Sequence, residues 1–473
     1  MLNRRHVVTC VILFAVMVGG AFWMQPRISV SDSDACAYTE GACSMQDGRG
    51  YVDARGYRLN HWPPGYSWLL SLFPDPLRGA LVINYLALGV AVAFIYLLTQ
   101  NAGWRPLASS GAALALGFGF FRSIAIFAKP DILAYALFLV GMRCLGGENN
   151  RWRTLGGCLW SALIPVKLMA VVFAPALVLV DCIVLRDSRK SLRPLHCALI
   201  VGIWSMAVAV VVGFNYHTMG VALPATHEAG NFRTCVSETV QFCVTFFRSF
   251  LANWYGSVWK IRALVPFALT VLSALACLIT LRPYPEGKRY AWLGITMLGM
   301  TWALEMVRHF SGDSRLTGYG LLLVLLAFRP AASSGKYWLT YAGLTILLTL
   351  TNVFTTNSLG VNDPRYAHVA QEFAAAHVSP ELLYTNSYRV LDVHARLPSI
   401  AVDRLEDVPP GAIFLRIVLP SYDAIQRTTW TIEEPPADWQ TIARWKDAIL
   451  YRRPASTANA GREGAGIAAS QPD

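Results

Sequence analysis

Long apolar runs recur along this chain, and short polar segments that carry most of the charge separate them. Runs that approach the ~20 residues a helix needs to cross a bilayer predict membrane-spanning helices. The pattern gives about eleven spans, and the shorter ones need flanking residues to complete a crossing. The runs lie at residues 7–23, 79–98, 107–127, 132–145, 155–165, 168–185, 196–214, 263–281, 291–306, 318–328 and 338–354.

The first run follows Arg4 and Arg5, so it has the form of either a secretory signal peptide or a membrane anchor. A signal peptide ends in small residues before its cleavage site. Here the bulky Phe22, Trp23 and Met24 stand at that place. We therefore expect an anchor that is retained.

Basic residues fall on alternate boundaries of the runs, which predicts the orientation of the chain. Cytoplasmic loops carry an excess of Lys and Arg, so these boundaries are expected to face the cytoplasm together with the N-terminus. The prediction is a multi-pass plasma (inner) membrane protein whose C-terminal part is extracytoplasmic. The basic residues concerned are Arg4, Arg5, Arg105, Arg143, Arg151, Arg153, Arg186, Arg189, Lys190, Arg193, Arg282, Lys288, Arg289, Arg329 and Lys336.

The pattern changes after the last run, which predicts a second domain. Residues 1–354 form the expected transmembrane domain with an outer loop at residues 25–78, and residues 355–454 form a small α/β domain outside the membrane. Within it, apolar and polar residues alternate at 412–419 and 448–452, which predicts strands. The pattern at 366–377 and 439–445 predicts amphipathic helices. The tail at residues 455–473, rich in Ala, Gly and Ser, is expected to be disordered.

Composition supports a membrane protein and excludes an ordinary soluble one. Of 473 residues, 55% are hydrophobic and only 15% are charged. The net charge of +11 is explained by Arg and Lys at membrane boundaries, where anionic lipid head groups attract them, so it requires no nucleic acid. The predicted fold class is an α-helical polytopic membrane protein with a small α/β domain.

Cysteines and histidines give no defined metal site. Cys36 with Cys43, and Cys235 with Cys243, lie in expected outer loops and would form local disulfides in an oxidising compartment, or stay free. Neither pair has zinc-finger spacing, and no tight cluster of carboxylates and histidines is visible. The sequence thus points to no cofactor, although it leaves a divalent metal open.

An ordered set of residues marks the outer loop after the first run. The set consists of Asp34, Tyr38, Ala42, Gly48, Gly50, Tyr51, His61, Trp62, Pro63, Pro64, Gly65 and Tyr66. This order resembles the first outer loop of the GT-C superfamily of membrane glycosyltransferases, which includes protein O-mannosyltransferases and aminoarabinose transferases and uses lipid-linked sugars. The resemblance implies transfer of a sugar, with inversion, from a polyprenyl-phosphate donor to a lipid, polysaccharide or protein acceptor at the extracytoplasmic face.

The same resemblance assigns roles within this loop. Asp34 matches the catalytic carboxylate, and a general base is what removal of the acceptor's proton requires. Asp32, two residues earlier, is the fallback base or an acceptor-orienting group. His61 and Tyr66 fall in the turn that returns the chain to the membrane, where substrate binding is expected.

Further substrate-binding residues are expected in later outer turns. Lys129 and Asp131 flank Pro130, and Asp131 either caps the next helix or serves the site, or does both. Lys167 lies between two apolar runs and either contacts the donor phosphate or snorkels to the interface. Arg308 and Arg315 lie in the late outer turn, where a phosphate contact competes with a simple boundary role.

A transporter or flippase of a lipid-linked sugar is the alternative function. In that interpretation Asp131, Lys167 and Glu305 would line a path near the middle of the membrane. The concentration of charges at one face, and the lack of broken helices repeated in two halves, argue for the transferase instead.

Overall fold

The structure is a computed structural model, and it describes the greater part of the chain. The described residues are 4–26, 28, 33–53, 56, 58–59, 62–146, 149–184, 193–219, 261–284, 287–308, 317–331, 334–356, 364–376, 383–385, 399–402, 404–418 and 434–455. The chain divides into two compact units, the first made mainly of residues up to Ser358 and the second mainly of Leu359–Asp473. Apart from Ala455, the predicted disordered tail lies outside the described residues, and so do Cys235 and Cys243.

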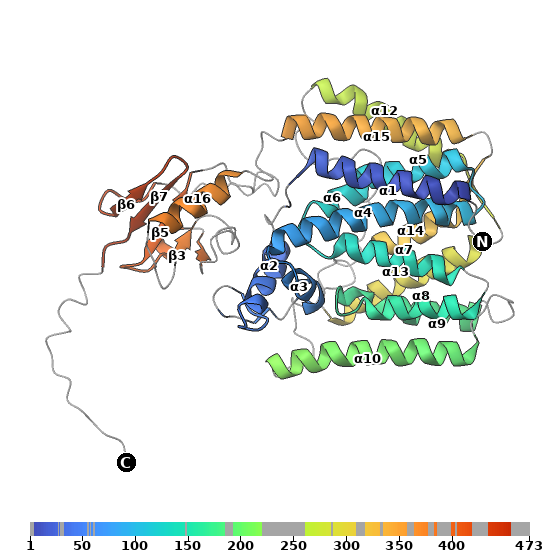
Figure 1. Ribbon diagram of the computed structural model, residues 1–473, viewed down its shortest axis with the longest axis horizontal. Coiled ribbons are helices and arrows are strands. Elements are labelled where there is room, and N and C mark those ends of the chain that lie inside the picture. Colours follow the sequence, from blue (N-terminus) through green and yellow to red (C-terminus); the bar gives the residue numbers. More distant parts are fainter. Residues whose placement is uncertain are drawn as a thin grey trace, which may run out of the picture. The chain divides into compact units, whose positions relative to one another are not determined.

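The first unit is a helical bundle (Figure 1). Each predicted apolar run coincides with one of its helices or with a consecutive group of them. The helices are α1 (Arg4–Met24), α2 (Ser33–Gln46), α3 (Pro64–Ser71), α4 (Pro76–Asn101), α5 (Pro106–Leu116), η1 (Gly117–Phe121), α6 (Arg122–Ala125), α7 (Asp131–Leu145), α8 (Asn150–Ala162), η2 (Leu168–Val172), α9 (Phe173–Leu179), η3 (Val180–Val184), α10 (Pro194–Met219), α12 (Ile261–Ile279), α13 (Lys288–Arg308), α14 (Thr317–Leu326) and α15 (Gly335–Thr356).

Several helices have the length and composition of membrane spans. Among the described residues, α1, α4, the continuous helix Pro106–Ala125 and most of α10 are long and apolar enough to cross a bilayer. Two apolar stretches are shorter, Ala170–Cys182 and Leu269–Ile279. Together with the small sheet of the second unit, these helices confirm the predicted fold class.

The two ends of the bundle differ in character. One end of the bundle is called the α3 end. Helices α1, α6 and α8 end there, and α4 and α7 begin there. Helices α2 and α3 lie beside them (Figure 1). At the other, the ribbon end, β1 (Leu281–Pro283) pairs antiparallel with β2 (Phe328–Pro330). The described basic residues of the alternate boundaries gather at the ribbon end, at the starts of α1, α5, α8, α10, α13 and α15, at the end of α7 and in β1 and β2. The sequence predicts this one-sided distribution.

Helix α4 is the centre of the bundle and packs against α1, α5 and α7. Helix α8 lies between α7 and α10, while α15 packs against α5 and α12. The α7–α8 contact is close because the ring of Phe138 stacks on Trp160, with centroids 4.9 Å apart, and because Gly141 faces Gly156. Small residues of this kind allow two helix backbones in a membrane to approach.

The second unit is a mixed sheet with one helix. The strands are β3 (Leu383–Thr385), β4 (Ser399–Ala401), β5 (Ile413–Ile417), β6 (Gln440–Arg444) and β7 (Ala448–Arg452), in the order β4-β3-β5-β7-β6. β3 is parallel to β4 and β5, and β7 is antiparallel to β5 and β6. Val369 and Phe373 of α16 (Pro364–Ala375) pack on Leu415 and Leu450 in one face of the sheet.

One prediction from the sequence is wrong, and one alternative that the sequence left open is decided. Residues 439–445, predicted as an amphipathic helix, contain strand β6, because pairing with β7 satisfies its backbone and tertiary contacts override a weak local preference. For Cys36 and Cys43 the sequence left a disulfide or two thiols open, and the structure has two thiols, both buried in α2. Seven positions along one helix separate their Cα atoms by about 10 Å, beyond the ~7 Å that a disulfide bridges.

The close α7–α8 contact predicts that Gly156→Ala destabilises the bundle. A Cβ at this position would lie 2.6 Å from the carbonyl oxygen of Gly141. The helices must then separate, which lowers the free energy of unfolding by about 1–3 kcal/mol. The matched control is Gly202→Ala on α10, where no atom lies within 4 Å of the added group. Thermal unfolding in detergent should show a lower midpoint for Gly156→Ala alone, and equal midpoints would contradict the close contact.

Candidate functional site

A buried ion pair lies at the α3 end of the bundle. Nζ of Lys167 is 2.8 Å from Oδ1 of Asp131, and the two side chains are 11% and 2% exposed. Each charge would be costly to bury alone, and a close partner offsets much of that cost. The structure therefore joins two residues that the sequence placed in different outer turns.

Local chain geometry fixes both members of this pair. Asp131 is the first residue of α7 and follows Pro130, whose carbonyl already accepts from the amide of Ala134 at 2.8 Å. Lys167 follows the end of α8, where the carbonyl of Leu163 accepts from the amides of Val166 and Lys167 at 2.9 and 2.8 Å. Lys167 itself is extended, and this breaks the helix between α8 and η2.

The turn before α4 docks onto the Lys167 turn. Pro64 is the first residue of α3, a position at which the missing N–H of proline costs nothing. The next amide, from Gly65, donates to the carbonyl of Pro165 at 2.9 Å. A Cβ on Gly65 would lie 2.6 Å from that oxygen, so the contact requires glycine. The Pro63-Pro64-Gly65-Tyr66 turn is thus held two residues from Lys167.

Tyr66 and Asn84 connect this turn to the Asp131 turn. The hydroxyl of Tyr66 donates to Oδ1 of Asn84 at 2.9 Å, and both side chains are fully buried. Nδ2 of Asn84 donates to the carbonyls of Ala125 and Phe127, at 3.2 and 2.6 Å. Because carbonyls only accept, this network fixes the orientation of the amide. Asn84 therefore links α3, α4 and the segment that leads into Asp131.

The surroundings of Tyr66 keep its phenol protonated. Burial raises the pKa of Tyr66 above its ordinary value, the negative charge of Asp131 raises it further, and the hydrogen bond with Asn84 lowers it. The net direction is upward, so the hydroxyl remains a hydrogen-bond donor through the whole physiological pH range.

Helix α2 packs against α3 through a second pair of contacts. The hydroxyl of Ser67 donates to the carbonyl of Tyr38 at 2.8 Å. The rings of Tyr38 and Tyr66 meet edge to face, with centroids 5.5 Å apart. The motif residues Tyr38 and Tyr66, far apart in the outer loop, are therefore direct neighbours.

The predicted site residues fall into three groups. Asp131, Lys167 and Tyr66 are brought together at the α3 end. Lys129 lies with its Nζ 5.6 Å from the ring centroid of Phe127, and Asp34 lies in the first turn of α2. Asp32, His61 and Arg315 lie outside the described residues, as do the side chains of Arg308 and Glu305.

Sequence analysis did not single out Asn84 and Arg122, which are polar residues of this end. Both are buried and both lie inside apolar runs. A polar or charged residue within a predicted span is itself a signal, because such residues are rare there and usually functional. Reading each run residue by residue for this signal would have found them.

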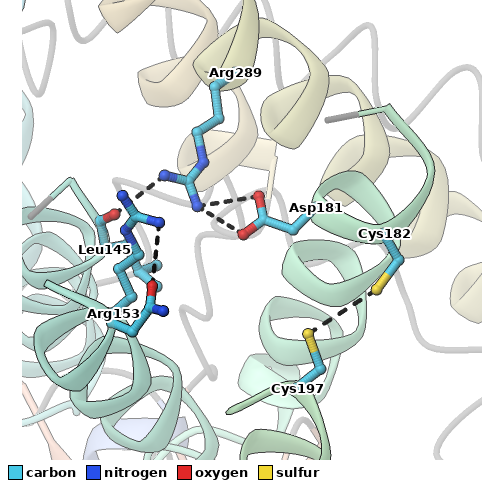
Figure 2. Close-up of polar contacts among 7 residues, drawn as sticks. Leu145, Arg153, Asp181, Cys182, Cys197 and Arg289 are labelled. Carbon is cyan, nitrogen blue, oxygen red and sulfur yellow. Dashed lines mark hydrogen bonds and ion pairs between the residues drawn. The ribbon is translucent and has the colours of Figure 1, made fainter. Parts of the chain in front are cut away.

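A second buried ion pair connects helices at the ribbon end of the bundle. Figure 2 shows Arg289, at the start of α13, between Asp181 of η3 and the end of α7. Its Nη2 contacts both oxygens of Asp181 at 3.0 and 2.9 Å, and its Nη1 donates to the carbonyl of Leu145 at 3.1 Å. One guanidinium nitrogen thus contacts both carboxylate oxygens, and hydrogen bonds between charged groups are stronger than those between neutral ones. It joins three helical segments, so we interpret it as structural.

The residues that could hold a metal are few. Within the described ranges no group of three or more His, Cys, Asp or Glu side chains converges on one point. The contacts among Asp131, Lys167, Tyr66 and Asn84 bring together instead one carboxylate, one ammonium, a phenol and an amide.

The fold and these contacts define a polytopic helical membrane protein with a buried polar centre at one end of its bundle. No protein-family model and no curated protein matches the sequence. The chain is similar in structure to ArnT from Cupriavidus metallidurans, in a crystal structure bound to undecaprenyl phosphate. The TM-score is 0.47 at 12% sequence identity, over 95% of this chain and 98% of that chain.

The Asp131–Lys167 pair predicts a non-additive effect on stability. Asp131→Leu or Lys167→Met alone leaves one buried charge without its partner, which should lower the free energy of unfolding by about 3–5 kcal/mol. The double variant removes both charges, so it should unfold closer to wild type than either single variant. Denaturation of all four proteins in the same detergent measures this coupling. Additive losses would show that the two charges do not stabilise each other.

Proposed function

We propose that this protein is a membrane glycosyltransferase of the GT-C kind. It transfers a sugar from a polyprenyl-phosphate donor to an acceptor at the α3 end, with inversion at the anomeric carbon. The observation that carries this proposal is the buried Asp131–Lys167 pair fastened to the Pro63-Pro64-Gly65-Tyr66 turn. A motif that resembles the loop of these enzymes thus lies against a charged centre of the kind that their chemistry needs.

The reaction assigns a separate role to each charge. The acceptor oxygen or nitrogen forms a bond to the anomeric carbon while the bond from that carbon to the phosphate oxygen breaks. The acceptor's proton passes to the carboxylate of Asp34, with Asp32 as the fallback. The polyprenyl phosphate leaves with the electron pair, and Lys167 stabilises its growing negative charge. Asp131 holds the ammonium of Lys167 in place at 2.8 Å.

Helical spacing supports the role of Asp34. Asp34 and Tyr38 are four residues apart in α2, so they lie on the same face of that helix. The Tyr38 ring contacts Tyr66 on α3, which relates this face to the Pro63-Pro64-Gly65-Tyr66 turn. Lys129, His61, Arg308 and Arg315 remain proposed substrate contacts.

The environment of the reaction follows from the distribution of charge. With the basic ribbon end in the cytoplasm, the α3 end and the second unit face the extracytoplasmic side of the plasma (inner) membrane. Apolar grooves between the helices would hold the polyprenyl chain, and membrane lipids surround the bundle. The acceptor is a lipid, a polysaccharide or a protein.

This proposal predicts that Asp34→Asn abolishes transfer. Loss of the general base should lower the rate by about 10²–10⁴-fold, because a positioned base contributes that much. The assay uses purified protein in proteoliposomes with a panel of polyprenyl-phosphate hexoses and pentoses, and it measures the release of polyprenyl phosphate in the presence of acceptor extract. The matched control is Asp47→Asn, an exposed carboxylate of the same loop that pairs with Arg49.

The outcomes separate the candidate functions. Unchanged transfer by Asp34→Asn would reject this residue as the base and shift the assignment to Asp32. Movement of the lipid across the vesicle membrane by wild type, without release of polyprenyl phosphate, would reject the transferase and establish the transporter or flippase.

A further inference from the structure

Arg122 is a buried charge to which the transfer reaction described above assigns no role. It belongs to α6, in the last turn of the continuous helix Pro106–Ala125, and α6 lies at the α3 end (Figure 1). The residue is buried, with 9% of its surface exposed. A charge inside a membrane span is costly and usually marks a functional site.

The guanidinium of Arg122 is poorly satisfied by the protein. Its Nη2 is 3.5 Å from Oε1 of Gln25, longer than the usual 2.7–3.2 Å of an N–H···O bond, and its buried Nε has no acceptor. In the described part of the chain, no carboxylate forms an ion pair with it. A guanidinium has five N–H donors, so this site has capacity for an anion with several acceptor oxygens.

The surrounding structure holds this side chain in a fixed frame. The hydroxyl of Tyr85 donates to the carbonyl of Gln25 at 2.6 Å, which anchors the end of α1 beside α4. Arg122 directly follows η1, a π-helix, and π-helical turns occur frequently at functional sites. Tyr85 is also the neighbour of Asn84, so adjacent residues of α4 support Arg122 and the Asp131 turn.

We propose that Arg122 binds the phosphate group of the polyprenyl-phosphate lipid. A planar guanidinium matches two phosphate oxygens, and the low-dielectric surroundings strengthen the interaction. The inference rests on the proposed function, and it adds a cation on α6 to the phosphate contact assigned to Lys167. A phospholipid head group or free phosphate shares this chemistry, so the test must separate these sources.

The test compares binding of decaprenyl phosphate and decaprenol, which differ only in the phosphate. Full-length protein in nanodiscs is titrated with each lipid, with phosphatidylglycerol and with inorganic phosphate. Arg122→Gln should weaken the binding of decaprenyl phosphate by about 10–100-fold, as expected for a lost charged hydrogen bond. The affinity for decaprenol should stay within about twofold of wild type. Arg122→Lys, which keeps the charge but loses the planar fork, should fall between. The matched control is Arg105→Gln, an exposed arginine at the other end of the same span.

The ratio of the two lipid affinities distinguishes binding from folding. If Arg122 has a merely structural role, its substitution weakens the binding of both lipids equally and leaves the ratio of their affinities at the wild-type value, which would overturn the proposal. Arg122→Lys allows the same ratio to be measured if Arg122→Gln does not fold. An equal loss of phosphatidylglycerol or inorganic phosphate binding would overturn the choice of lipid. Wild type that binds no decaprenyl phosphate would reject the proposed function as well, whereas wild-type binding that Arg122→Gln retains would reject this inference alone.

Discussion

The contact between Asp131 and Lys167 is the constraint on which the α3 end depends. A carboxylate and an ammonium with so little exposure stabilise each other strongly in the low-dielectric interior, and neither can be withdrawn cheaply. The turns that carry them must therefore stay together. Pro165 then fixes α3, and Asn84 fixes α4 against the segment before Asp131. Four stretches of chain are thus brought to one place by a few directional contacts.

The bundle has buried ion pairs at both ends and mainly nonpolar or aromatic packing between them. Arg289 and Asp181 form the ion pair at the ribbon end, whereas Phe138, at the middle of α7, stacks on Trp160 with centroids 4.9 Å apart. Dispersion contacts are individually weak and tolerate small shifts of one helix along another. Hydrogen-bonded charges do not, so the polar ends set the axial register of the helices.

Local properties of the sequence predicted much of this structure, and pairing between distant segments could not be predicted. Apolar runs located the helices because length and hydropathy belong to each segment alone. The motif and the isolated charges pointed to Tyr66, Asp131 and Lys167, which the structure brings together and whose roles stay predictions. Asp181 and Arg289, 108 residues apart, gave no sign of their pairing. Residues 439–445 contain a strand because β7 lies beside them. Asn84 and Arg122 were overlooked because the mean hydropathy of a whole run is high even when the run contains one polar residue.

The π-helix η1 has a consequence for how this protein can change over time. A π-helical turn accommodates one residue more than an α-helical turn, and one residue turns a helix by about 100°. The five residues Gly117–Phe121 therefore set the direction in which every later side chain of that helix points. Most insertions or deletions in a span are harmful because they rotate the remainder of the helix. Here the rotation is already part of the architecture, so natural variation is expected to preserve the length of this short segment.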